Sequence, residues 1–129
     1  MPHVIIDSNI NLDLIHDTFQ PKEHRYSLND ETSLLKLTDS FQNTLKNRML
    51  IQTISIENNT STEYFIELIK KLNQITIRLF PFTYPDHKTA NVIRSIAFVS
   101  HMIREANKDN SFIVLTTNIQ PYLDEFFEP

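Results

Sequence analysis

Pro2 is the residue of this sequence with the most distinctive chemistry. Proline is small enough at the second position for methionine aminopeptidase to remove Met1, so we expect the mature chain to begin with Pro2 as a free secondary amine. An α-amino group has an unperturbed pKa of about 7.7 to 8.0, and desolvation or a nearby cation lowers that pKa. A neutral amine at this position would suit a general base near neutral pH. Taken alone, Pro2 is better explained as merely a common second residue.

Three basic side chains are candidates for binding an anionic substrate. Lys88 precedes a long predicted helix, Arg48 stands at the entrance of a predicted strand, and Arg78 lies within another predicted strand. A cation beside the reacting atoms stabilises both a carboxylate and a developing enolate. The alternative for Arg48 and Arg78 is a solvated charge on the protein surface.

A metal site is a weaker hypothesis. His101 and Glu105 stand four residues apart on a predicted helix, and this spacing orients two metal ligands on one face. No third ligand accompanies them, so an exposed helical pair is the better interpretation. We therefore expect no metal ion.

The composition excludes several classes of site. The 129 residues contain no glycine and no cysteine. A P-loop, a dinucleotide-binding fingerprint and a nucleophile elbow all need glycine where the backbone has a positive φ or lies against a phosphate. Without cysteine there is no disulfide, thiolate nucleophile or cysteine zinc site. We expect no cofactor.

The charge and hydropathy patterns restrict the partners and the location. Twelve basic and sixteen acidic side chains give a net charge of −4, without a long block of either sign. Duplex nucleic acid usually requires a concentrated basic surface. No apolar run approaches the roughly 18 residues that span a bilayer, and the first residues lack the features of a signal peptide. We expect a cytoplasmic protein that binds neither nucleic acid nor membrane.

Four segments predict strands, from β-branched runs or from alternation of apolar and polar residues. They are residues 4–6, 49–57, 75–82 and 112–115. Residues 10–14 either continue the first strand or lead out of it, and residues 16–33 are predicted to be a loop. Phe80, Phe82 and Tyr84 either line an apolar pocket or pack in the core, and core packing is the favoured alternative.

Three segments predict helices from apolar residues spaced three or four apart. They are residues 33–47, a short helix at 61–73 and the longest pattern at 89–107. In the second segment Thr60 and Glu63 match a capping box. Residues 121–129 are predicted to be a tail that packs on another subunit.

The opening of the chain resembles a known family. Residues 2–12 read Pro-His-Val-Ile-Ile-Asp-Ser-Asn-Ile-Asn-Leu. They are similar to the start of the 5-carboxymethyl-2-hydroxymuconate isomerases of the tautomerase superfamily, which begin Met-Pro-His, continue with an aliphatic triplet and an acidic residue, and have Asn-Leu where Asn11 and Leu12 stand here. The resemblance implies an α+β fold in which two β-α-β halves form a four-stranded sheet backed by two main helices. It also implies a homotrimer with sites at the subunit interfaces and the amino-terminal proline as base.

The sequence departs from this family at the substrate-binding arginines. Family members carry one arginine on the second strand and another in a Gly-Arg-Ser turn before the second helix. Here Leu50 and Gln52 stand near the first position, with Arg48 only at the strand entrance, and His87 or Lys88 occupies the turn. Lysine does not conservatively replace an arginine that binds with two parallel hydrogen bonds.

These patterns lead to two main hypotheses for a single tautomerase-like domain over residues 1–129. The first is an isomerase of aromatic catabolism that moves a proton on an enol or dienol carboxylic acid, with Pro2 as base and Lys88, Arg48 and Arg78 as substrate-binding cations. The second is a non-catalytic, oligomeric binding module that uses its surface, including residues 122–127, because the family's arginines are missing. A third alternative is an unrelated α+β domain with an accidental resemblance.

Overall fold

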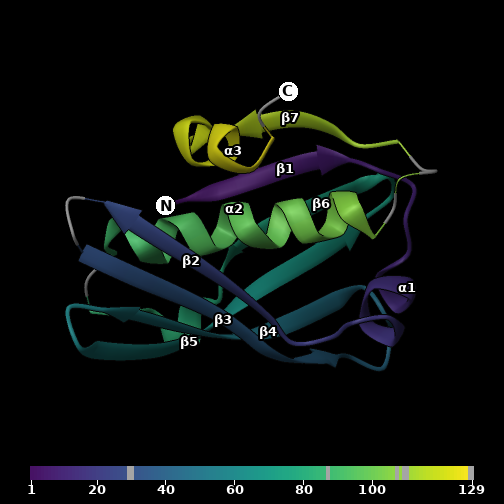
Figure 1. The fold of residues 1–129 in the computed structure, drawn as a ribbon. Coiled ribbons are helices and arrows are strands. Elements are labelled where there is room, and N and C mark those ends of the chain that lie inside the picture. The colour runs from purple at the N-terminus through teal and green to yellow at the C-terminus, as the bar shows by residue number, and fades with distance from the viewer. Residues whose placement is uncertain (29–30, 87, 107, 109–110, 128–129) are drawn as a thin grey trace.

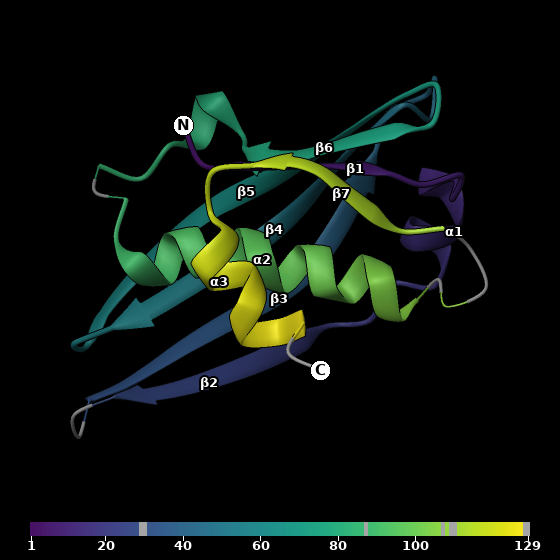
Figure 2. The same cartoon turned by 90° about the horizontal axis from the view of Figure 1, so that it is seen from above.

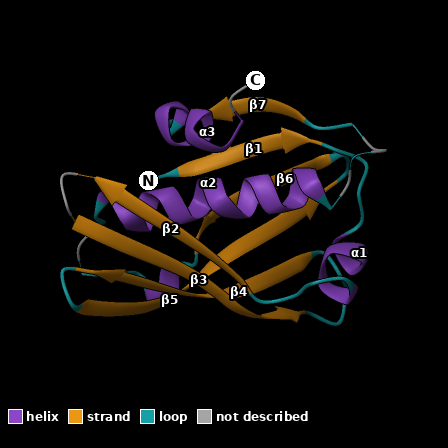
Figure 3. Ribbon diagram, viewed as in Figure 1, coloured by secondary structure: helices purple, strands orange, loops and turns teal. Residues whose placement is uncertain are grey.

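The computed structural model describes residues 1–28, 31–86, 88–106, 108 and 111–127, which form one antiparallel sheet with helices packed against it. Strands dominate these residues (Figure 3). The sheet has seven strands in the order β2-β3-β4-β5-β6-β1-β7. In chain order the elements are β1 (His3–Asp7), α1 (Leu12–Asp17), β2 (Lys22–Leu28), β3 (Glu31–Gln42), β4 (Arg48–Glu57), β5 (Thr60–Lys71), β6 (Gln74–Leu79), the 3-10 turn η1 (Pro81–Thr83), α2 (Ala90–Glu105), β7 (Ile113–Thr117) and α3 (Gln120–Phe127).

The sheet curls around α2, which lies along the concave face (Figures 1 and 2). Side chains alternate between the two faces of a strand, and every second residue of the central strands is buried against α2. In β4 the concave face carries Met49 and Ile51, and in β5 it carries Tyr64, Ile66 and Leu68. Burial of these apolar side chains supplies the main free energy that stabilises the fold.

The helix α2 is covered on its other side by α3 (Figure 2). Phe126 of α3 stacks on Phe98 of α2, with ring centroids 5.7 Å apart. The buried Arg94 of α2 donates from Nε to Glu125 of α3 over 2.6 Å. Residues 121–127 therefore form a helix that packs on their own chain, and the predicted tail is wrong for them. Their packing on another subunit stays a prediction. Residues 128–129 lie outside the described residues.

The tight turns between strands are built without glycine. Asn58 and Asn59 connect β4 to β5 with φ of 50° and 63°, and Leu72 begins the turn from β5 to β6 with φ of 58°. Asparagine tolerates the left-handed region, but for leucine its Cβ is crowded there and the conformation costs roughly 1 to 2 kcal/mol. The chain therefore makes at least one strained hairpin turn where glycine would be free of strain.

The predicted four-stranded sheet with two main helices is wrong. The described residues form a curled seven-stranded sheet in which every neighbouring pair of strands is antiparallel. A pair of β-α-β units requires parallel strands joined by crossover helices, and the six-residue α1 is the helix between β1 and β2. The fold implied by the family resemblance is therefore overturned.

Three of the predicted segments differ from the structure. Residues 33–47 and 61–73 were predicted to be helices, but they lie in β3 and β5 and their turns. Residues 16–33 were predicted to be a loop, but they contain β2 and the start of β3. Residues 10–14 lead out of β1 into α1 rather than continuing the strand.

The other predicted elements are confirmed. The strands predicted at 4–6, 49–57 and 112–115 correspond to β1, β4 and β7, and the helix predicted at 89–107 corresponds to α2, with residue 107 outside the described residues. The strand predicted at 75–82 corresponds to β6 up to Leu79, and its last residues belong to η1 instead. The helix α2 begins after Thr89, whose side-chain oxygen accepts a hydrogen bond from the backbone N–H of Val92. Among the described residues, no helix combines the length and the apolar character needed to cross a bilayer.

Candidate functional site

Glu67 is a buried acidic residue on the convex face of the sheet, where a side chain normally meets solvent. Glu67 lies on β5 between Ile66 and Leu68, whose side chains face α2. Because successive side chains of a strand point to opposite faces, Glu67 points away from α2. Only 2% of Glu67 is exposed. A buried carboxylate needs compensating partners, because removing a charge from water is costly.

Two arginines supply these partners. Arg78 lies directly opposite Glu67 on β6 and donates from Nε and Nη2 to Oε1, at 3.0 and 2.9 Å. Arg48 begins β4 and reaches the other carboxylate oxygen, Oε2, from Nη1 at 3.4 Å. The structure therefore brings together two of the predicted substrate-binding cations, on either side of one carboxylate that was not singled out from the sequence.

The strand register places these groups in a row across the convex face. Phe41 of β3 pairs with Leu50 of β4, Leu50 with Glu67, and Glu67 with Arg78. His3 of β1 is the next partner in the row, opposite Arg78. Residues directly opposite in an antiparallel sheet have Cβ atoms only about 5 Å apart. The row therefore runs from an apolar end at Phe41 to a basic end at Arg78 and His3.

An open pocket of about 460 Å³ lies over the part of this row that is formed by Phe41, Leu50 and Glu67. Three aromatic side chains, Phe41, Phe80 and Phe82, line it together with Leu50, and Arg48 and Glu67 are its charged lining residues. The Phe80 and Phe82 rings contact each other edge to face, with centroids 5.4 Å apart. Small-molecule sites usually combine an apolar lining with a few placed polar groups. We call this hollow the arginine pocket.

The charges at the arginine pocket do not balance. Two guanidinium groups face the single carboxylate of Glu67, so one positive charge remains without a partner in this group of three. Arg78 is committed to Glu67 by two short hydrogen bonds. Arg48 makes one long contact, its side chain is 56% exposed, and a guanidinium has five N–H donors. Arg48 is therefore the cation with donors available to an incoming anion.

Lys88 and Pro2 lie elsewhere. The ammonium of Lys88 lies 4.7 Å from the centre of the Tyr84 ring, and the Tyr84 hydroxyl lies 2.8 Å from the Met1 sulfur. Pro2 is buried beside β1, and strand alternation places it on the face opposite to His3. Lys88 and the amino terminus thus share Tyr84, whereas Arg48 and Arg78 lie on the convex face. His87, the alternative to Lys88, lies outside the described residues.

The carbonyl of Met1 is itself bound. It accepts a hydrogen bond from Nδ2 of Asn118 over 2.7 Å, and Nδ1 of His3 lies 3.0 Å from the same oxygen. In this arrangement the Pro2 nitrogen belongs to a peptide bond and has no lone pair for a proton. Pro2 is available as a base only in a chain from which Met1 has been removed.

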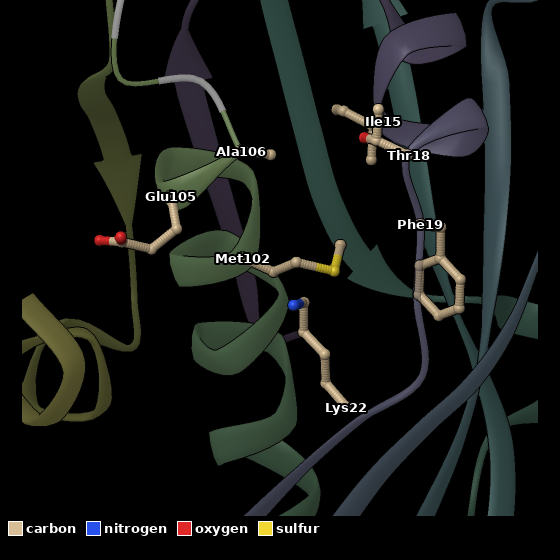
Figure 4. Close-up of a pocket in the computed structure, with 7 residues that line it drawn as sticks. All are labelled: Ile15, Thr18, Phe19, Lys22, Met102, Glu105 and Ala106. Carbon is tan, nitrogen blue, oxygen red and sulfur yellow. The ribbon is translucent and has the colours of Figure 1, made fainter.

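A second, smaller hollow of about 290 Å³ lies between α1 and the end of α2 (Figure 4). Its lining is mainly apolar, and Lys22 extends its ammonium toward Met102. The Glu105 carboxylate points away from the hollow, and it forms an ion pair with Lys108 at 3.2 Å. This hollow contains a cation but no arrangement of groups that would orient a ligand.

The His101 and Glu105 pair does not form a metal site. Among the described residues, no group of three or more histidine or acidic side chains is placed to hold a metal ion. His101 instead packs against Phe126, with centroids 5.7 Å apart, and its Nδ1 atom is buried without a hydrogen-bond partner. Its role is in the contact between α2 and α3.

Comparisons of the chain with protein-family models, with curated proteins and with solved structures find no match. The function is therefore inferred from the residues and their geometry alone.

Glu67 is the residue of the arginine pocket that the sequence interpretation missed. Glu67 lies within the helix predicted at 61–73. In that helix it is a polar residue between the five apolar residues on which the prediction rests, which are Phe65, Ile66, Leu68, Ile69 and Leu72. The signal in the sequence is that Arg48 and Arg78, on the two neighbouring strands, carry the charge opposite to that of Glu67. This relation can be recognised only if residues 60–71 are interpreted as a strand. The aromatic residues Phe80 and Phe82 line the pocket, which is the less favoured of their two predicted roles. Tyr84 does not line it and packs against the core, as the favoured alternative predicts.

Proposed function

We propose that this protein is a non-catalytic binding module that captures a carboxylate attached to an apolar group in the arginine pocket. One observation supports the proposal above the others: two arginines share the single buried carboxylate of Glu67 beside an aromatic hollow. A second carboxylate at Arg48 would restore the balance of charge. The apolar part of the same ligand would cover Phe41 and Phe82, which are 48% and 88% exposed.

The roles of the two arginines differ in this proposal. Arg78 holds the Glu67 side chain in place, because its two bonds to Oε1 fix the carboxylate from β6. Arg48 turns its open donors toward the ligand, and a hydrogen bond between charged groups contributes about 1.5 to 3 kcal/mol. Removal of the Arg48 charge should therefore weaken binding about 10-fold to 100-fold.

The test is isothermal titration calorimetry with 3-phenylpropionate and its alcohol analogue, 3-phenylpropanol. The unchanged protein should bind the acid and bind the alcohol at least about tenfold more weakly. Arg48→Met should weaken binding of the acid, and Arg25→Met, which removes an exposed arginine from the distant edge strand β2, should leave it unchanged. Equal binding of acid and alcohol, or equal binding by Arg48→Met and the unchanged protein, would contradict the proposal.

We also propose proton transfer by Pro2 as a second candidate function, because Lys88 packs on Tyr84, and the Met1 sulfur of the chain that keeps Met1 contacts the same tyrosine, so that Lys88 lies near the start of the chain. In a chain without Met1, the Pro2 amine would take the proton from the hydroxyl of an enol or dienol acid and return it to a carbon of the conjugated system, while Lys88 would bind the carboxylate. The amino-terminal resemblance to the hydroxymuconate isomerases supports the same chemistry.

The two functions are separated by the amino terminus. Intact-mass spectrometry should show loss of Met1, and Pro2→Ala should abolish enol–keto exchange of phenylpyruvate while leaving binding at Arg48 unchanged. A retained Met1, or unchanged exchange in Pro2→Ala, would exclude Pro2 as the base.

A further inference from the structure

The two edges of the sheet differ in charge. The edge strand β2 carries Lys22, Glu23 and Arg25, all exposed. The edge strand β7, with the sequence Ile-Val-Leu-Thr-Thr, carries no charged residue. Natural edge strands are usually protected from pairing with other chains by charges, proline or a covering element. β2 has such protection. β7 lacks the charges and the proline, and the protecting feature that it does have is a bulge at Leu115, where its register with β1 shifts.

The β7 strand is also exposed. It pairs with β1 on one side, and among the described residues no strand pairs with its outer edge. Ile113 and Leu115 expose 56% and 47% of their surface. In Figure 1 the strand lies at the margin of the molecule. An exposed apolar edge strand presents unpaired N–H and C=O groups as a template for another strand.

We propose that β7 is a self-association strand through which two copies of this chain form a dimer. The two β7 strands would pair antiparallel about a two-fold axis and join the two sheets into one. The partner is a second copy because the antiparallel pairing of β7 with itself sets only aliphatic and threonine side chains opposite one another. No like charges meet in that arrangement, and cross-strand pairs of β-branched residues are favourable.

The charged edge β2 limits the assembly to a dimer. If β7 paired with β2 of another copy, each molecule would keep a free edge and the assembly would grow without closing. That pairing would oppose Leu115 and Ile113 to the charged β2 residues. Pairing of β7 with β7 is symmetric and closes with two copies.

This inference is independent of the proposed ligand site. The arginine pocket is formed by residues from β3, β4 and β5 and by Phe80 and Phe82 after β6, and β1 separates these strands from β7. A variant of β7 therefore leaves the pocket unchanged, and loss of ligand binding in Arg48→Met leaves the dimer unchanged.

The experiment is sedimentation velocity of the full chain over a range of concentrations. The unchanged protein should shift from monomer to dimer as concentration rises. Leu115→Lys should remain monomeric, whereas Leu14→Lys, at a leucine of α1 that is 45% exposed, should still dimerise. A trimer, a monomer at every concentration, or a dimer of Leu115→Lys would overturn the proposal.

Hydrogen exchange of the unchanged protein provides a second measurement that does not depend on a variant folding. The amides of residues 113–117 should exchange at least several-fold more slowly at a concentration where the dimer forms than in dilute solution. A dimer that leaves the exchange of these amides unchanged would place the interface elsewhere and overturn the proposal.

Discussion

Glu67 and Arg78 face each other across β5 and β6, with the Arg78 Nε and Nη2 atoms 3.0 and 2.9 Å from the same carboxylate oxygen. This pair is the fixed part of the arginine pocket. Arg48 completes the group from β4 through a longer contact of 3.4 Å to the other oxygen. The unequal geometry of the two arginines predicts unequal consequences when each is removed.

Arg78→Met should lower the free energy of unfolding by about 1.5 to 3 kcal/mol, because it removes two charged hydrogen bonds from a carboxylate that is 2% exposed. Arg48→Met should lower it by less than about 1 kcal/mol, because the Arg48 side chain is 56% exposed and makes one long contact of 3.4 Å to Glu67, which keeps its bonds to Arg78. Urea denaturation of the two variants measures the difference. Equal losses, or a greater loss for Arg48→Met, would show that Arg48 is a structural residue instead of a ligand-binding one.

A double variant tests whether the loss of stability in Arg78→Met comes from the Glu67 carboxylate, which that variant leaves without its two closest hydrogen bonds. Adding Glu67→Leu to Arg78→Met should recover part of the stability, because an apolar side chain replaces a buried charge that has lost its closest partner. No recovery in the urea midpoint would mean that Arg78 stabilises the fold through its packing alone.

Phe82→Ala should weaken binding of 3-phenylpropionate about threefold to tenfold and leave stability nearly unchanged. Phe82 is 88% exposed, so folding buries little of its apolar surface and the substitution should cost little stability. Its ring lines the arginine pocket, where it would contact the apolar part of a ligand. Leu45→Ala, at another highly exposed residue, is the control for general surface effects. An unchanged affinity in Phe82→Ala would place the ligand outside the aromatic wall.

Leu72→Gly should raise the free energy of unfolding by about 1 kcal/mol. Its φ of 58° is strained for leucine and free of strain for glycine, and the side chain is 86% exposed, so little packing is lost. Leu45→Gly is the matched control, because Leu45 is similarly exposed but is not among the residues with positive φ. The control should be neutral or destabilising in the same thermal denaturation assay.

Acid should destabilise the contact between α3 and the rest of the protein. His24 of β2 and His101 of α2 both contact Phe126, at 4.7 and 5.7 Å between ring centres. Burial lowers the pKa of each histidine below the ordinary value of 6.5, and Arg94 lowers that of His24 further. Glu125 acts in the opposite direction and raises the pKa of His24. For His101, Glu105 raises the pKa, whereas Arg104 and Lys22 lower it further.

The direction of the pH effect follows from these depressed pKa values. The unfolded chain takes up protons near pH 6.5, before the folded chain does, so stability is fully present above that pH and declines as the pH falls below it. Replacing both residues, as His24→Phe with His101→Phe, should flatten the stability profile between about pH 7 and pH 5. An unchanged slope in the double variant would assign the acid sensitivity to other groups.

The sequence predicts correctly those elements whose apolar residues repeat with one clear period, either every second residue for a strand or every three to four residues for a helix. It fails where the apolar residues fit both periods. In β3 the apolar residues Leu34, Leu35, Leu37 and Phe41 match helical spacing, but a bulge between Leu37 and Asp39 shifts the strand register. The bulge changes the face on which later residues appear. Strict alternation is therefore interrupted, and the leucine stripe imitates a helix.

The strand β5 was missed for a different reason. Its convex face carries the apolar residues Phe65 and Ile69 on either side of Glu67. Together with the concave residues Ile66 and Leu68 they form a nearly continuous apolar run that fits a helix as well as a strand. The turns on either side, at Asn58-Asn59 and Leu72-Asn73, contain no glycine to mark them. The same mistake concealed Glu67, so the sequence identified the two arginines of the site without the carboxylate that joins them.

The most direct measurement of the central claim is an ¹⁵N NMR titration that observes the Arg48 side-chain Nε–H while 3-phenylpropionate is added. The account predicts a saturable shift of this signal, together with contacts between the phenyl ring of the ligand and the rings of Phe41, Phe80 and Phe82. An Arg48 signal that does not move, or shifts that centre on Lys22 and Met102 in the hollow between α1 and α2, would contradict it.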